Sequence, residues 1–172
     1  MRRLLVAMLA VLLSGCWFGY GLFTESDARV VLTPGVYRLA EPGRASHDVR
    51  IAILPSGMTR LDDPESDDGD AVYGFVPLAG SNRFLVWMGK FGKPSEQLTQ
   101  IYFFGERRGA GSFAFFVPSC ADEDGQIAVA AGAVIESGSA PSCRFPNKAA
   151  VLRALAQVRP NQRDTLVLTK VR

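Results

Sequence analysis

Short apolar or alternating segments recur along most of the chain, and turn-forming Pro, Gly, Asn and Ser residues separate them. Short strands at regular spacing with turns between them are typical of β-sandwiches and β-barrels. The predicted strands cover residues 29–33, 35–40, 48–54, 58–62, 71–78, 83–89, 98–106 and 112–118. We therefore expect a mainly β fold, a single sandwich or partly closed barrel of about 8–10 short strands with one C-terminal amphipathic helix.

Residues 48–54 show the alternation most clearly, because Val49, Ile51 and Ile53 fall on one face of an extended chain. A Pro-Ser-Gly sequence follows directly. Gly57 can supply the positive φ that a tight turn requires. We therefore expect a hairpin between this strand and the next one.

Two predicted strands are apolar on both faces, around residues 101–104 and 113–116. Such a strand either lies in the centre of the fold or has another element packed over its outer face. Residues 146–159 are a candidate cover, because their apolar residues recur at helical spacing. Asn147 is suited to cap the start of this helix, and Pro160 to end it.

Two further segments leave alternatives open. Residues 164–171 alternate like a final strand, in which either Leu166 and Leu168 or their neighbours face the core. Residues 126–136 are apolar without a decisive period, so they fit a strand or a short helix equally well.

The first residues follow a different pattern. Two arginines precede the uncharged residues 4–13, and Ser14, Gly15 and Cys16 come next. A positive start, a short apolar run and a small-residue cleavage site together indicate a secretory signal peptide. A membrane-spanning helix needs roughly 20 apolar residues, about twice the length of this run.

The four residues Leu13-Ser14-Gly15-Cys16 resemble the lipobox of bacterial lipoproteins. The resemblance implies that Cys16 is acylated and becomes the first residue of the mature chain. Because Trp17, and not Asp, follows the cysteine, it also implies a lipid anchor in the outer membrane, facing the periplasm. An uncleaved anchor helix over residues 4–23 is the alternative, and it too places the rest of the chain beyond the cytoplasmic membrane.

The chain then divides into three parts. We expect residues 1–15 to be the lipoprotein signal peptide, residues 16–26 a lipidated tether near the bilayer, and residues 27–172 a single β-rich periplasmic domain. The tether assignment rests on the aromatic residues at its start, which are favourable at a membrane interface. The alternative is that Phe18 and Phe23 pack onto the domain.

Composition narrows the range of partners and sites. Loss of Arg2 and Arg3 with the signal peptide leaves 17 basic residues against 17 acidic ones. A neutral chain lacks the basic patch that nucleic acid attracts, so we expect no nucleic-acid partner. Cys120 and Cys143 remain as an even pair in an oxidising compartment, which predicts a disulfide worth about 3–3.5 kcal/mol.

Candidate catalytic and metal-binding residues are few. The single histidine, His47, accompanies no recognisable nucleophile motif, so we expect an exposed loop histidine, no enzymatic activity and no cofactor. The acidic loop at residues 62–70 offers oxygen ligands for Ca²⁺, with Asp63, Asp67 and Asp70 as weak candidates. Its spacing does not match an EF-hand, so a solvated loop tip is the simpler interpretation.

These observations favour a non-enzymatic, lipid-anchored envelope protein with a binding or assembly role. Its expected partners are the membrane, through the lipid anchor, and an envelope protein. The alternative is a binder of a small apolar ligand, or an inhibitor of an envelope-directed enzyme. For a ligand binder, Phe104, Phe113 and Phe115 are the candidate lining residues, because they lie on the two-sided aromatic strands.

Overall fold

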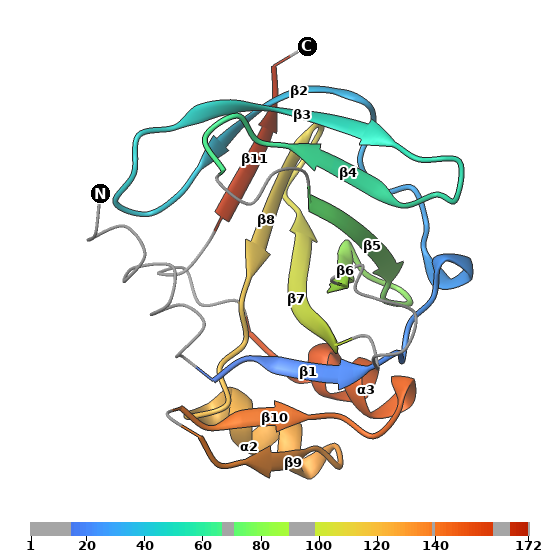
Figure 1. The fold of residues 1–172 in the computed structure, drawn as a ribbon, viewed down its shortest axis with the longest axis vertical. Helices are drawn as coiled ribbons and strands as arrows, with labels where there is room; N and C mark the ends of the chain where they lie inside the picture. Colours follow the sequence, from blue (N-terminus) through green and yellow to red (C-terminus); the bar gives the residue numbers. More distant parts are fainter. Residues whose placement is uncertain (1–14, 67–70, 90–98, 139, 160–165, 172) are drawn as a thin grey trace.

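Eight strands of the computed structural model close into an antiparallel β-barrel (Figure 1). The structure describes residues 15–66, 71–89, 99–138, 140–159 and 166–171. The barrel strands are β2 (Gly35–Ala40), β3 (His47–Ile53), β4 (Thr59–Asp62), β5 (Ala71–Pro77), β6 (Arg83–Gly89), β7 (Thr99–Arg107), β8 (Ser112–Phe116) and β11 (Leu166–Lys170). The expected mainly β fold is thus confirmed as a closed barrel.

Each barrel strand pairs with its neighbour along the chain, from β2 through to β8. Strand β11 completes the ring by pairing with β8 on one side and β2 on the other. In this register Leu168 lies opposite both Phe113 and Leu39. The predicted β3–β4 hairpin is also present, with Gly57 at φ +83°.

Alternate residues of these strands point into the barrel and form its inner core. Val49 and Ile51 are buried there with Ile53 packed against them, as the alternation predicts. Leu168 is buried in the same cluster and Leu166 packs against it, which decides between the two faces of the last strand. The buried members of the inner core are Leu32, Tyr37, Leu39, Val49, Ile51, Phe75, Phe84, Val86, Phe113 and Leu168.

A second, outer core lies between the outer face of β6–β8 and elements packed over it (Figure 1). These elements are β1 (Trp17–Tyr20), α2 (Glu123–Ala130), β9 (Val134–Glu136), β10 (Ser142–Arg144) and α3 (Lys148–Gln157). Val151 and Leu155 of α3 belong to the same buried cluster as Tyr102 and Phe116 of the barrel wall. The two-sided apolar strands are therefore covered by the predicted helix, whose first turn Asn147 caps.

The start of the folded part differs from the expected tether. Residues 17–20 form β1, which pairs with β7 and, in parallel, with β10. Trp17 and Phe23 are buried in the outer core. Phe18 and Phe23 therefore pack onto the domain, which is the alternative to a free tether, because aromatic residues bury more apolar surface against the barrel wall than they would in a tether.

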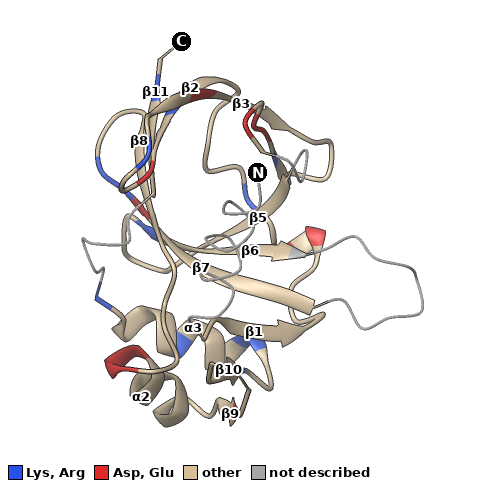
Figure 2. Ribbon diagram, turned by 60° about the vertical axis from the view of Figure 1, so that its left-hand side comes forward, with Lys and Arg blue, Asp and Glu red and all other residues tan. Residues whose placement is uncertain are grey.

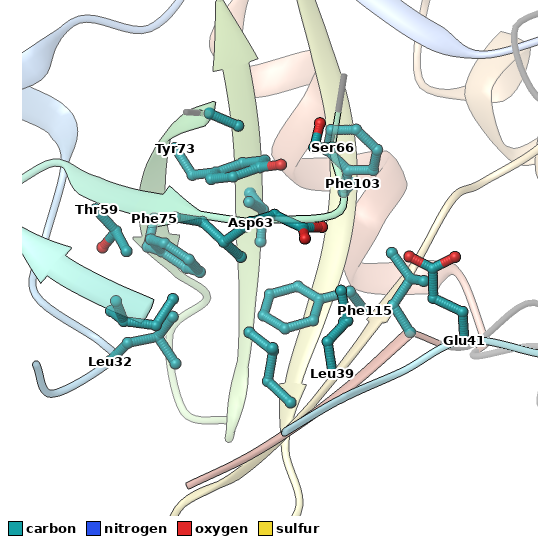
Figure 3. A pocket seen from close by; sticks show the side chains of 16 residues that line it. Leu32, Leu39, Glu41, Thr59, Asp63, Ser66, Tyr73, Phe75, Phe103 and Phe115 are labelled. Atoms are coloured by element: carbon teal, nitrogen blue, oxygen red, sulfur yellow. The ribbon is translucent and has the colours of Figure 1, made fainter. Parts of the chain in front are cut away.

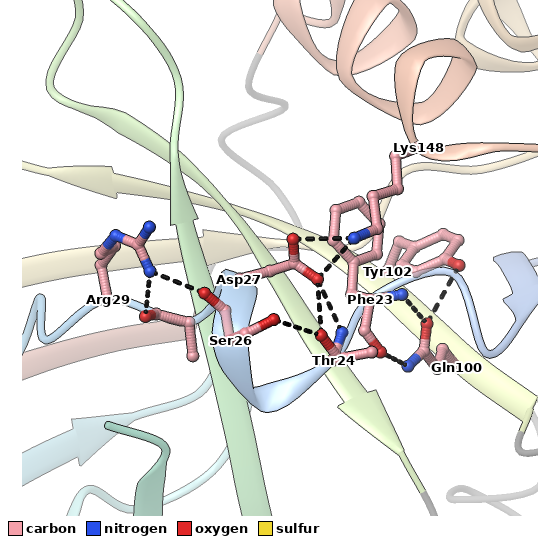
Figure 4. Close-up of polar contacts among 9 residues, drawn as sticks. Phe23, Thr24, Ser26, Asp27, Arg29, Gln100, Tyr102 and Lys148 are labelled. Carbon is pink, nitrogen blue, oxygen red and sulfur yellow. Dashed lines mark hydrogen bonds and ion pairs between the residues drawn. The ribbon is translucent and has the colours of Figure 1, made fainter. Parts of the chain in front are cut away.

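Gln100 fixes this N-terminal segment to the barrel (Figure 4). Its side chain is fully buried, and its amide accepts a hydrogen bond from the Phe23 N–H at 2.9 Å and donates one to the Phe23 carbonyl. Nearby, the ammonium group of Lys148 in α3 lies 2.6 Å from a carboxylate oxygen of Asp27. Phe23 is thereby joined to β7, and the 3-10 turn η1 (Glu25–Asp27) to α3.

The predicted Cys120–Cys143 disulfide is confirmed, with the two Cα atoms 5.5 Å apart. It joins the residues before α2 to β10. It therefore links two parts of the outer lobe, which comprises the elements β1, α2, β9, β10 and α3 that pack over the barrel wall. Cys16 lies beside the disulfide, because the Cys143 N–H donates a hydrogen bond to the Cys16 carbonyl at 3.1 Å.

Two details correct or complete the predicted elements. Residues 29–33 are not a strand but an irregular segment, in which the Arg29 N–H donates to the Phe75 carbonyl. Residues 126–136 contain both a helix end and a strand, so the structure adds a second α-helix, α2.

In the described part of the chain, no helix has both the length and the apolar character needed to cross a bilayer.

Replacing Gln100 should destabilise the fold strongly. In Gln100→Leu the buried N–H and carbonyl of Phe23 lose their partners, and we expect a loss of about 2–4 kcal/mol in the free energy of unfolding. Urea unfolding measures this loss. Gln157→Leu, at an exposed helix position, is the matched control and should change stability by less than about 0.5 kcal/mol. Equal losses in the two variants would contradict the role given to Gln100.

Candidate ligand-binding site

The interior of the barrel contains a cavity of about 260 Å³ (Figure 3). All eight barrel strands contribute apolar side chains to its wall. One residue from each strand in chain order is Leu39, Ile51, Leu61, Phe75, Val86, Phe103, Phe115 and Leu168. An eight-stranded barrel is just wide enough to be filled by its own side chains or to hold one small ligand.

Strand β4 and the residue that follows it show how the cavity wall changes from the inside to the mouth. Thr59, Leu61 and Asp63 line the cavity at every second position, because alternate residues of a strand share a face. At a rise of about 3.3 Å per residue, Thr59 and Asp63 are roughly 13 Å apart along the strand direction. The wall therefore runs from a hydroxyl through an apolar zone to a carboxylate.

Two carboxylates, those of Asp63 and Glu41, line the mouth of the cavity. Figure 2 shows acidic positions beside β2 and β3. Oδ1 of Asp63 is 3.0 Å from Nε2 of His47 and accepts a hydrogen bond from the Glu65 N–H. Oε2 of Glu41 is 3.0 Å from a guanidinium nitrogen of Arg44. Within the described residues, the other carboxylate oxygen of each has no hydrogen-bond partner.

Tyr73 lies in the wall opposite Thr59 in the β4–β5 pairing. Burial, and next the negative charge of Asp63, raise the pKa of the Tyr73 hydroxyl above its ordinary value. The hydroxyl therefore stays protonated at neutral pH and keeps its capacity to donate a hydrogen bond.

Thr59 carries an unpaired hydroxyl in this apolar wall. Its side chain is 1% exposed, and Oγ1 has no hydrogen-bond partner among the described residues. A buried polar group without a partner costs roughly 1–3 kcal/mol, so most such groups in proteins are paired. No described residue pairs with the Thr59 hydroxyl, so this group can form a hydrogen bond with a molecule inside the cavity.

The far end of the barrel is closed by the irregular segment before β2. Leu32 from this segment lines the cavity, and the Tyr37 hydroxyl donates a hydrogen bond to the Thr33 carbonyl at 2.9 Å. A second hollow, of about 350 Å³, is lined by Tyr37, Phe113, Arg107 and Lys170 among others. The two hollows have opposite charge, acidic at the mouth and basic at the closed end.

The three predicted lining residues separate in the structure. Phe115 lines the cavity, while Phe113 also faces inward but borders the second hollow. Phe104 does not face the interior: it is buried in the outer core, where it lies opposite Phe116 in the strand pairing. The neighbouring Phe103 points inward instead. Two adjacent phenylalanines on a strand covered on both faces give no signal as to which one points inward.

The calcium hypothesis gains no support from the described residues. Asp63 already contacts His47 and the Glu65 amide, and Asp67 and Asp70 lie outside the residues that the structure describes. Over the ranges that are described, no group of three or more His, Cys, Asp or Glu side chains could hold a metal ion.

His47 is not the exposed loop histidine that the sequence predicts. It begins β3, and its side chain is only 13% exposed. Besides Asp63 it approaches Glu65, with 3.5 Å between Nδ1 and a carboxylate oxygen. Asp63 is 16 positions away in sequence, so only the β3–β4 pairing could reveal this contact. His47 holds Asp63 in place at the cavity mouth.

The raised pKa of Tyr73 predicts a loss of stability at high pH. Between the ordinary tyrosine pKa of about 10 and the higher folded value, the unfolded chain ionises first, so the stability falls as the pH rises. Tyr73→Phe removes this contribution. We expect its free energy of unfolding to fall less than that of the wild type between about pH 8 and about pH 10.5. Identical decreases in both proteins, measured by urea unfolding, would contradict the burial of Tyr73 in the cavity wall.

No protein-family model, no curated protein and no solved structure matches this chain. The function proposed for it therefore rests on the geometry of the cavity and on the residues at the N-terminus.

Proposed function

We propose that this chain is a lipid-anchored, non-enzymatic envelope protein whose barrel binds one small apolar ligand. The observation that carries the proposal is the cavity of about 260 Å³ with apolar side chains from all eight strands. Native interiors are close-packed, and voids larger than a water molecule are few. A water molecule needs about 10–15 Å³ of such space, so this cavity is far larger than an ordinary packing defect.

The dimensions and lining of the cavity limit the ligand. Pockets for drug-sized molecules measure roughly 300–1,000 Å³, and this cavity lies just below that range. Its wall is apolar except at the mouth and at Thr59 and Tyr73, a pattern in which apolar contact provides affinity and a few polar groups orient the ligand. A short alkyl chain with one polar end has these properties.

The lipobox-like residues support the membrane anchor. Cys16 is only partly exposed and lies where the folded part begins, directly before the buried Trp17. An acyl chain on Cys16 would hold the outer lobe close to the bilayer. The barrel lies on the other side of this lobe (Figure 1), so its cavity would be available to ligands in the periplasm.

A partner-binding role is the second candidate, and the edge of the outer lobe favours it. Strand β9 is the last strand in the sheet order and pairs only with β10 among the described strands. Its residues Val134 and Ile135 are about half exposed, as is Val129 at the end of α2. A free strand edge with exposed apolar side chains can pair with a strand of another envelope protein.

A substitution that fills the cavity tests ligand binding in the barrel. Octan-1-ol should bind the protein saturably at one molecule per chain, as measured by titration calorimetry. Ala71 lines the cavity, so Ala71→Trp should fill it and weaken binding at least tenfold, a change of about 1.4 kcal/mol. Ala52 is the control position, because it lies between the inward-facing Ile51 and Ile53 in sequence and therefore faces outward from β3. Ala52→Trp should bind octan-1-ol like the wild type. Binding that survives Ala71→Trp would contradict the site.

The anchor has its own test. Cys16→Ser removes the thiol that acylation requires, so we expect labelled palmitate to be absent from the variant and present on the wild type. The membrane fraction should lose the protein at the same time. A variant that still carries the label would contradict the lipobox assignment.

A further inference from the structure

We infer that the ligand of the barrel carries a positively charged head group, which lies at the cavity mouth between Glu41 and Asp63 while its apolar body extends inward. This inference rests on the proposed ligand-binding function and names the class of ligand, an elongated amphiphilic amine. It joins three features of the cavity: free carboxylate oxygens at the mouth, aromatic rings beside them, and a partnerless hydroxyl deep inside.

The charge at the mouth has one sign where the ligand would lie. Glu41 and Asp63 line the cavity, whereas the neighbouring Arg44 and His47 do not. Arg44 contacts one carboxylate oxygen of Glu41 and His47 contacts one of Asp63, and within the described residues the second oxygen of each carboxylate has no partner. An anionic head group would meet two carboxylates in a half-buried mouth, where charge repulsion is stronger than in water. An ammonium group would instead gain charge-assisted hydrogen bonds.

Aromatic rings lie beside the same carboxylates. Tyr73, Phe103 and Phe115 all line the cavity, and Figure 3 shows them around Asp63. The face of an aromatic ring attracts a cation within about 6 Å of its centre. Rings next to carboxylates are therefore a combination that favours a cationic head group over a neutral or an anionic one.

Thr59 is independent evidence that the interior receives a ligand. Its hydroxyl is buried, has no partner among the described residues and belongs to the cavity wall. It lies roughly 13 Å from Asp63 along the strand direction, so a ligand that reaches both the hydroxyl and the carboxylate must be elongated.

Three probes of equal length test the head group: octylamine, octan-1-ol and octanoate. They are titrated calorimetrically into the full-length protein in dodecyl maltoside micelles at neutral pH, with empty micelles as the blank. We expect octylamine to bind at least about tenfold more tightly than octanoate, with octan-1-ol between them. The double variant Glu41→Gln with Asp63→Asn should lower octylamine affinity to that of octan-1-ol. Its retained affinity for octan-1-ol shows that the cavity is intact.

Asp48→Asn is the matched control, because Asp48 is near the same rim but its side chain is half exposed and pairs with Arg38 outside the barrel. It should leave all three affinities unchanged. If octan-1-ol or octanoate binds as tightly as octylamine, the head-group inference is wrong while the ligand site stands. If none of the three binds the wild type, both are wrong. A preference for octylamine that persists in the double variant would also overturn the inference.

Discussion

The pairing of β11 with both β8 and β2 is the contact on which the rest of the structure depends. It joins the last strand of the chain to the first strand of the barrel and so closes the sheet. Without it, the inward faces of the other seven strands would be open to water, and the sheet would have two free edges. Closure turns those faces into an enclosed wall, which is the condition for a cavity inside.

The outer core explains how the protein can tolerate that cavity. Trp17, Phe116 and Leu155 are buried between the barrel wall and the outer lobe, where the Cys120–Cys143 disulfide and the Gln100 contacts add further constraints. The wall of the barrel is therefore packed from outside on β6–β8. Its interior need not be filled completely for the fold to be stable, and the space that remains is the site we assign to a ligand.

The strands and the covering helix were predictable because their residues alternate or recur at helical spacing between turn residues. The cavity was only partly predictable. Phe103 and Phe104 are equally apolar, and only the register with β8 decides that Phe104 faces the outer core. The His47–Asp63 contact depends on the pairing of two strands, and the burial of Trp17 depends on a barrel wall distant in sequence. Local pattern carries none of these long-range contacts.

The central claim is that a ligand occupies the interior of the barrel and not another apolar surface. Methyl NMR of the protein titrated with octan-1-ol tests this directly, because methyl groups report on both cores and on the outer edge. We predict shifts at the lining residues Leu39, Ile51 and Leu168 and unchanged signals at Val151 and Leu155 of the outer core. Shifts confined to the outer core, or to the exposed Val134 and Ile135 of β9, would contradict the account.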